Sequence, residues 1–255
     1  MKKKQPVLEP ADFYKRGDDY YLSHLSVDCV IFGFHNNELK VLLLEWKDTQ
    51  RWSLPGGFIY KEEHIDEAAI RILKLRTGLE KIYLRQFHTF GDPLRDQKKH
   101  GIKLPKEVTK SWLHERFVTI GYWALVEFST VVPTPDEFSA SCRWWDLQKL
   151  PSLILDHKEI TRKALGSLRR ELNNFPIVRD LLPQKFTMPE LQKLYETILG
   201  KNLDRRNFQK KMLALDILER LDEIKKGGAH KAPYLYRFDQ KKYEKAMKEG
   251  LRIAL

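Results

Sequence analysis

The feature that most constrains the fold is a run of strand-like segments that leads into one amphipathic helix behind a Pro-Gly-Gly loop. Residues 27–44 are rich in β-branched and aliphatic side chains and read as two strands around a short turn. The loop at 55–57 follows. Apolar residues then recur at helical spacing over 65–76, and Gly78 suits the left-handed end of a helix. This order predicts an α/β domain.

The rest of the first part of the chain continues this mixture of strands and helices. We expect three further strands and one helix, at 82–90, 117–128, 142–145 and 156–173. Asp156 is expected to cap that helix, with Glu159 as its capping-box partner. The polar loop at 91–116 is long for a compact domain, and loops of this length are usually functional or mobile.

The spacing of polar residues around the helix at 65–76 carries a motif. Gly57 is followed after five residues by Glu63, and seven more residues lead to Arg71. Leucine, glycine and leucine occupy the later positions of the pattern, at Leu73, Gly78 and Leu79. The segment resembles the Nudix box. This resemblance extends over roughly residues 25–170 and implies a Nudix-like α/β/α sandwich with a mixed sheet, in which Glu63 and Arg71 form a structural pair.

The same motif lacks the groups that the family uses for hydrolysis. The three metal-binding glutamates of the Nudix box fall on Ile72, Leu75 and Arg76. Carboxylates at this spacing meet on one helix face and hold Mg²⁺, which two aliphatic side chains and a cation cannot do. Four acidic residues remain nearby, at Glu62, Glu63, Asp66 and Glu67, where acidic side chains interact favourably with the helix dipole. We therefore expect no catalytic residues, no metal and no cofactor. The alternative for these four residues is a displaced metal site.

A Nudix pocket without its metal is interpreted as a binding site. The resemblance implies a ligand such as an ADP-ribose-like nucleotide, and a sugar is the other option. The side chains that we expect in the wall of this pocket are Trp52, Arg95, Arg116 and Tyr122.

The pattern changes after about residue 174. Pro176 and Pro183 bracket a linker-like stretch, and a helix, a turn, a second helix and a β-hairpin follow. The net charge is +2 over residues 1–154 and +9 over 155–255, so the basic surplus lies in the C-terminal part. This asymmetry favours a polyanionic partner. We expect two domains, at 1–174 and 175–255.

The second helix of this part, at 204–213, has the composition of a DNA-reading helix. Phe208 and Met212 face the core, and the opposite side is polar. Its polar residues can contact base edges or neutralise phosphates: Arg205, Arg206, Asn207, Gln209, Lys210 and Lys211. The hairpin tip adds Lys226 and Lys231 beside Gly227 and Gly228 as a wing.

The whole C-terminal part resembles a winged helix-turn-helix, and the chain resembles Nudix-related transcriptional regulators. The resemblance implies a ligand-responsive DNA-binding protein that works as a homodimer on a near-palindromic operator. The alternative is an active Nudix hydrolase, a nucleoside diphosphate-X pyrophosphatase, with a basic accessory domain. A third class is an RNA-binding or protein-interaction adaptor, which the charge asymmetry also permits.

Composition excludes several other classes. No apolar run approaches the roughly 20 residues of a spanning helix, and the basic N-terminus lacks the apolar segment of a signal peptide. The two cysteines, Cys29 and Cys142, cannot build a disulfide framework or a zinc cluster and are expected to be buried. We therefore expect a cytoplasmic protein that does not bind membranes.

Overall fold

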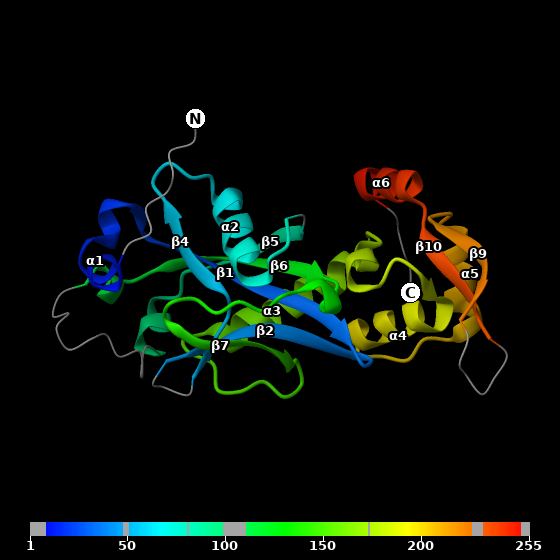
Figure 1. Ribbon diagram of the computed structural model, residues 1–255, viewed down its shortest axis with the longest axis horizontal. Helices are drawn as coiled ribbons and strands as arrows, with labels where there is room; N and C mark the ends of the chain where they lie inside the picture. Colours follow the sequence, from blue (N-terminus) through cyan, green and yellow to red (C-terminus); the bar gives the residue numbers. More distant parts are fainter. Residues whose placement is uncertain are drawn as a thin grey trace.

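A computed structural model describes residues 9–47, 51–80, 82–98, 111–172, 174–225 and 232–250. The helices are α1 (Pro10–Arg16), α2 (Ile65–Thr77), α3 (His157–Glu171), α4 (Met188–Leu199), α5 (Arg205–Ala214) and α6 (Gln240–Glu249). The strands are β1 (Tyr21–His35), β2 (Glu38–Trp46), β3 (Trp52–Ser53), β4 (Gly56–Tyr60), β5 (Tyr83–Phe90), β6 (Val118–Val126), β7 (Ser139–Asp146), β8 (Phe186–Thr187), β9 (Leu218–Ile224) and β10 (Tyr234–Phe238). The molecule is elongated, with the two sheets at different ends (Figure 1).

The larger sheet is mixed and is organised around the long strand β1. Its main path runs β3-β2-β1-β6-β5, with β4 also paired to β1 and β7 also paired to β2. The pair β1–β6 is parallel, whereas the other pairs are antiparallel. The helices α2 and α3 cover opposite faces, so that this part is an α/β/α sandwich as the sequence predicted.

Alternation along the central strands builds a separate core under each helix. On the α2 face, side chains of β1 and β6 pack against Ala68, Ala69, Ile72 and Leu73. On the α3 face, the alternate side chains of the same strands pack against Ile160, Ala164 and Leu168. Each residue of these strands therefore belongs to one layer or the other. Cys29 and Cys142 are buried free thiols, as expected.

Helix α2 forms where the periodicity placed it. It ends at Gly78, whose φ of +72° is left-handed and whose N–H donates to the Lys74 carbonyl at 2.8 Å. Its start is a capping box between His64 and Glu67, which the sequence analysis did not identify.

Two local expectations are wrong. The short extended segment does end before the Pro-Gly-Gly segment, since β3 stops at Ser53, but the expected loop at 55–57 is only a bend at Pro55. Gly56 already opens strand β4, where a Cβ atom would come within 2.3 Å of an Asp28 carboxylate oxygen. Asp156 occupies the N-cap position of α3 but makes no capping hydrogen bond with its side chain. Its carboxylate instead accepts a hydrogen bond from Arg95, and Glu159 pairs with Arg162.

The C-terminal part is a winged helix-turn-helix. Helices α4 and α5 form the helix-turn-helix, and β9 and β10 form the expected hairpin, to which β8 adds a third strand. Helix α6 follows with Asp239 as its N-cap and was not predicted.

The linker-like stretch after Pro176 is not an exposed linker. It forms a short 3-10 helix, Ile177–Leu181, whose Ile177 and Val178 are fully buried. The core under α3 continues through this segment to Leu191, Leu194 and Phe208 of the winged helix. Polar contacts cross the same boundary, because the Arg169 Nε donates to the Ile198 carbonyl at 2.7 Å.

Candidate functional site

The loop and helix of the Nudix-box segment are joined by one ion pair. The guanidinium of Arg71 donates two hydrogen bonds of 2.8 Å to the Glu63 carboxylate and one of 2.8 Å to the Phe58 carbonyl. It also lies 4.6 Å from the centre of the Tyr60 ring. The pairing of Glu63 with Arg71 expected from the sequence is therefore present, and it ties the loop after β4 to α2.

The three positions that carry glutamates in the Nudix box face different surroundings. Ile72 is buried, and its Cδ1 lies 3.2 Å from the point that a Cβ atom on Gly57 would occupy. Leu75 is 54% exposed. Arg76 forms an ion pair of 3.2 Å with Asp136, a residue of the loop between β6 and β7. Two aliphatic side chains and a guanidinium thus occupy the three positions where the family places carboxylates.

Three of the four acidic residues that remain near α2 have protein partners. Glu63 is bound to Arg71, Glu67 closes the capping box, and Asp66 accepts a hydrogen bond of 2.5 Å from the Tyr122 hydroxyl. Among the described residues, no group of three or more histidine, cysteine, aspartate or glutamate side chains is arranged to hold a metal ion.

The four predicted wall residues do not line one pocket. Trp52 is buried on the α3 face, where its ring meets Trp145 edge-on at 5.0 Å. Tyr122 is buried on the α2 face, and burial raises the pKa of its hydroxyl. Because the sheet lies between them, the expectation of a shared wall is wrong for this pair.

Arg95 and Arg116 hold the ends of the long loop instead. Arg95 is 4% exposed and donates to the Phe90 and Phe117 carbonyls, to Thr119 at 2.6 Å and to Asp156 at 2.9 Å. Arg116 donates to the Gly91 carbonyl. Both arginines therefore fasten this loop to the domain.

The surroundings of Arg95 form a buried polar network that the sequence analysis missed. Asp28 on β1 and His157 at the start of α3 lie beside it, with 3.8 Å between the nearest ring nitrogen and carboxylate oxygen. The Nδ1 of His157 accepts a hydrogen bond of 2.9 Å from the Leu54 N–H, so the ring is neutral. Burial raises the pKa of Asp28, and burial lowers the pKa of His157. The sequence offered one signal for this network, since Asp28 is a charged residue within the apolar stretch of β1.

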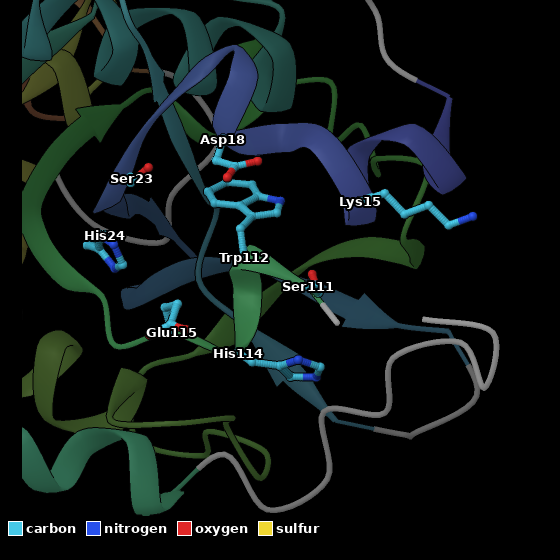
Figure 2. Close-up of a pocket in the computed structure, with 8 residues that line it drawn as sticks. All are labelled: Lys15, Asp18, Ser23, His24, Ser111, Trp112, His114 and Glu115. Atoms are coloured by element: carbon cyan, nitrogen blue, oxygen red, sulfur yellow. The ribbon is translucent and has the colours of Figure 1, made fainter. Parts of the chain in front are cut away.

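A cavity of about 480 Å³ opens near the start of β1, beside Ser23 and His24 (Figure 2). Its lining comes from α1 and the turn after it, from β1, and from the segment that ends the long loop: Lys15, Asp18, Ser23, His24, Ser111, Trp112, His114 and Glu115. None of the four predicted wall residues lines it. This volume is within the range of small-molecule sites.

Backbone strain and aromatic packing shape this cavity. His24 has a φ of +65°, which is unusual for a residue with a side chain, and it lies where the β1–β4 register shifts between Tyr21 and Ser26. Trp112 is fixed by Tyr21, whose ring is nearly parallel at 5.8 Å, and by Phe58 at 4.6 Å. The cavity therefore combines a rigid aromatic side with hydroxyl, imidazole and charged groups.

Helices α4 and α5 are built as a compact pair. Thr187 and Glu190 form a capping box at the start of α4, and Gly200 ends it with a φ of +70°. The Asp204 carboxylate caps α5 by accepting from the Asn207 N–H at 2.9 Å. Phe208 is buried on α5 and packs edge-on against Tyr195 of α4, with 5.5 Å between the ring centres.

The opposite face of α5 is open to solvent. Five of its predicted DNA-reading residues are exposed and Gln209 is half-buried: Arg205, Arg206, Asn207, Lys210 and Lys211. Three acidic side chains on β9 and α4 are paired with basic neighbours, since Glu219 binds Arg237, Glu223 binds Lys185 and Glu190 binds Lys225. The predicted wing residues Lys226 and Lys231 lie outside the described residues.

Comparison with known families assigns both parts of the chain. The Nudix domain model matches residues 22–165. The chain belongs to the Nudix family. The DNA-binding winged helix domain of NrtR matches residues 178–238. The combination agrees with the α/β/α sandwich and the winged helix-turn-helix of the structure.

Two curated relatives differ in how much of the chain they match. The ADPR responsive transcriptional repressor NtrR of Acinetobacter baylyi is 29% identical over 233 residues, which cover 89% of this chain and 86% of the relative. The ADP-ribose pyrophosphatase of Methanocaldococcus jannaschii is 24% identical over 151 residues, which cover 58% of this chain and 79% of the relative. The first match spans both domains.

Solved structures agree with this assignment. Shewanella oneidensis NrtR, in a complex with a 27mer DNA, has a TM-score of 0.68 and 25% identity, covering 86% of this chain and 95% of that one. A MutT/nudix family protein from Enterococcus faecalis shares the fold, with a TM-score of 0.62, 23% identity, and coverage of 93% and 90%. Within the described residues, no helix is long and apolar enough to cross a membrane.

Proposed function

We propose that this chain is a transcriptional regulator that binds double-stranded DNA through α5 and a small-molecule effector through its Nudix domain. The observation that carries the proposal is the match of both domains, over 89% of the chain, to an ADPR responsive transcriptional repressor. The similarity to this repressor also favours a role in repressing transcription and a location in the cytoplasm.

The DNA part of the proposal rests on the exposed face of α5. Arginine can bind guanine and asparagine can bind adenine in the major groove, so Arg206 and Asn207 are the proposed base-reading residues. Lys210 and the lysines of the wing would neutralise phosphates. One short helix reads only a few base pairs, and we therefore propose a homodimer on a near-palindromic operator.

The effector is proposed to be ADP-ribose, with a sugar as the alternative. The similarity to an ADPR responsive transcriptional repressor supports ADP-ribose. The 480 Å³ cavity is the proposed site, because its carboxylate, hydroxyl and imidazole side chains suit the ribose hydroxyls of such a ligand and Lys15 suits its phosphates. Trp112 supplies an apolar surface within the same lining.

We propose that the Nudix domain binds this ligand without hydrolysing it. The similarity to an ADP-ribose pyrophosphatase keeps the hydrolase alternative open to test. Against hydrolysis stand Ile72, Leu75 and the Arg76–Asp136 ion pair, because a guanidinium repels a divalent cation. We therefore expect no metal-dependent turnover.

One set of measurements tests the proposal. The full-length protein is titrated by fluorescence anisotropy with duplex DNA from its own upstream region, with a random duplex and with single-stranded RNA. Specific binding to the first is expected, and ADP-ribose should change that affinity by about 1–3 kcal/mol, roughly 5- to 150-fold. Equal binding to the random duplex, or preference for RNA, would contradict DNA regulation.

The same protein is then incubated with ADP-ribose and Mg²⁺ or Mn²⁺, and the release of AMP is followed. Turnover in the usual enzyme range of about 1–10³ per second would support the hydrolase alternative. An effector that binds tightly and leaves operator affinity unchanged would refute the sensor role.

A further inference from the structure

A second hollow lies between β5 and α3, apart from the cavity of Figure 2. It has a volume of about 270 Å³ and is lined by Phe87, His88, Arg162, Lys163, Gly166 and Arg170. No lining residue is shared with the larger cavity. We call this hollow the β5–α3 groove.

Positive charge dominates the β5–α3 groove. Arg162 is paired with Glu159 through two hydrogen bonds, of 2.6 and 2.7 Å. Lys163 and Arg170 form no ion pair with any carboxylate among the residues that the structure describes. Two cations with unmatched charge therefore border one hollow, and an anion there would gain from both.

Gly166 gives the groove its floor. It lies in the interior of α3, where glycine lowers helix stability relative to alanine. Its φ is not positive, and a Cβ atom there would meet only the Arg170 guanidinium, at an ordinary contact distance of 3.6 Å. Neither the backbone nor the packing requires glycine at this position. Because glycine has no side chain, this position leaves space between Lys163 and Arg170.

Lys163 is held in place by two aromatic neighbours. Its Nζ lies 2.9 Å from the His88 Nε2 and 5.2 Å from the centre of the Phe90 ring. An ammonium can only donate, so the His88 nitrogen accepts and the ring is neutral. Burial and then the charge of Lys163 lower the pKa of His88. The lysine uses one N–H on His88 and keeps the others for a ligand.

We propose that the β5–α3 groove binds a small phosphoryl anion, of the size of phosphate or pyrophosphate. Arginine forks and a lysine ammonium are the groups that proteins use for phosphate oxygens. The groove is smaller than the usual site for a nucleotide-sized ligand, so it suits a compact anion or the terminal phosphate of a larger metabolite. This site is separate from the proposed effector site and from α5.

Calorimetric titration of the full-length protein with pyrophosphate, and separately with inorganic phosphate, tests the site. We expect saturable binding that Lys163→Met and Arg170→Gln each weaken at least tenfold. Gly166→Leu should abolish it by filling the floor. Arg143→Gln is the matched control, since Arg143 is an exposed arginine on β7 outside the groove, and its titration should equal that of the native chain. Glucose 6-phosphate competing for the same site would identify a phosphomonoester as the source.

Three results would overturn the proposal. The first is the absence of pyrophosphate and phosphate binding to the native chain at millimolar concentration. The second is unchanged binding in folded Arg170→Gln and Lys163→Met proteins, with folding checked by circular dichroism, which covers the case in which Gly166→Leu does not fold. The third is a loss of random-duplex affinity in Arg170→Gln with pyrophosphate binding intact, which would make the groove a DNA contact.

Discussion

The arginines near α2 and the long loop of the Nudix domain and the arginines of helix α5 are used in opposite ways. In the Nudix domain, Arg71, Arg76 and Arg95 each meet a carboxylate of the protein, and Arg95 is buried with four hydrogen-bond acceptors. On α5, Arg205 and Arg206 are exposed and form no ion pair with any described residue. The first group joins loops to helices, and the second is available to a partner.

This difference teaches that residue type alone does not identify a ligand contact. Arg95 and Arg206 are both arginines in polar stretches, and the sequence suggested binding roles for both. The distinction is the presence of an acidic partner in space, which for Arg95 is Asp156, 61 residues away. A charge already matched inside the protein has less to gain from a ligand than an unmatched one.

The largest expected effect is on stability. Arg95→Met removes one partner of a buried ion pair and leaves Asp156 and a threonine hydroxyl without their donor. We expect the free energy of unfolding to fall by about 3–5 kcal/mol. Urea denaturation measures this, with Arg206→Ala as the control, which should stay within about 0.5 kcal/mol of the native chain. A comparable loss in Arg206→Ala would break the contrast between the domains.

The next effect is on specific DNA binding. Arg206→Ala or Asn207→Ala should each cost about 1–3 kcal/mol on the operator and leave random-duplex affinity unchanged, because a base contact carries the sequence information. Anisotropy titrations on both duplexes measure the difference. If Arg206→Ala weakens the random duplex equally, that side chain contacts phosphate and our recognition assignment is wrong.

A smaller effect concerns pH and the buried network. His157 has a pKa below its usual 6.5 in the folded protein, so the unfolded chain takes up a proton first as the pH falls. Stability is therefore lost below about pH 6.5. The raised pKa of Asp28 acts in the opposite direction, while Asp156 and Arg95 complete the charged surroundings of the ring.

An Asp28→Asn variant removes the opposing group and isolates the histidine. Its stability should fall by up to about 1.4 kcal/mol per pH unit below pH 6.5, more steeply than that of the native chain. Urea denaturation at several pH values measures both slopes. If the unfolding free energy of the variant falls with pH no more steeply than that of the native chain, the proton taken up on unfolding does not bind to His157.

The smallest effect is on the wing. Lys226→Ala or Lys231→Ala should weaken all duplexes about equally and lower the slope of log affinity against log salt by about one. A salt series on the operator and the random duplex measures it. If DNA affinity is unchanged in both lysine variants and in Arg206→Ala, the basic C-terminal part is a solvated surface.

Local patterns predicted local structure well. The limits of α2, the left-handed Gly78, and the order of α4, α5 and the β9–β10 hairpin all depend on neighbours within a few residues. The Glu63–Arg71 pair was also predictable, because the family motif fixes its spacing. Helix α6 also has local signals in the sequence, although it was not predicted. Asp239 is a suitable N-cap residue, and Tyr243 and Ala246 follow it at helical spacing.

Long-range partners could not be predicted in the same way. Asp156 had the position of a cap, and only the fold brings Arg95 to it from a loop whose path the sequence does not specify. Trp52 and Tyr122 were expected in one pocket, but strand alternation sends them to opposite faces. The division of the chain at residue 174 remains a prediction.

The core that runs through Ile177 and Val178 into the winged helix has a mechanical consequence. A chain with a loose tether could respond to an effector by releasing its DNA-binding part, whereas here the tether itself is packed and Arg169 is bonded to the end of α4. A tilt of the Nudix domain would then be transmitted to α5 through packed side chains rather than lost in a flexible linker. In the proposed dimer, the distance between the two α5 helices would then depend on the orientation of each Nudix domain. Effector binding would therefore change which spacing of operator half-sites the dimer fits.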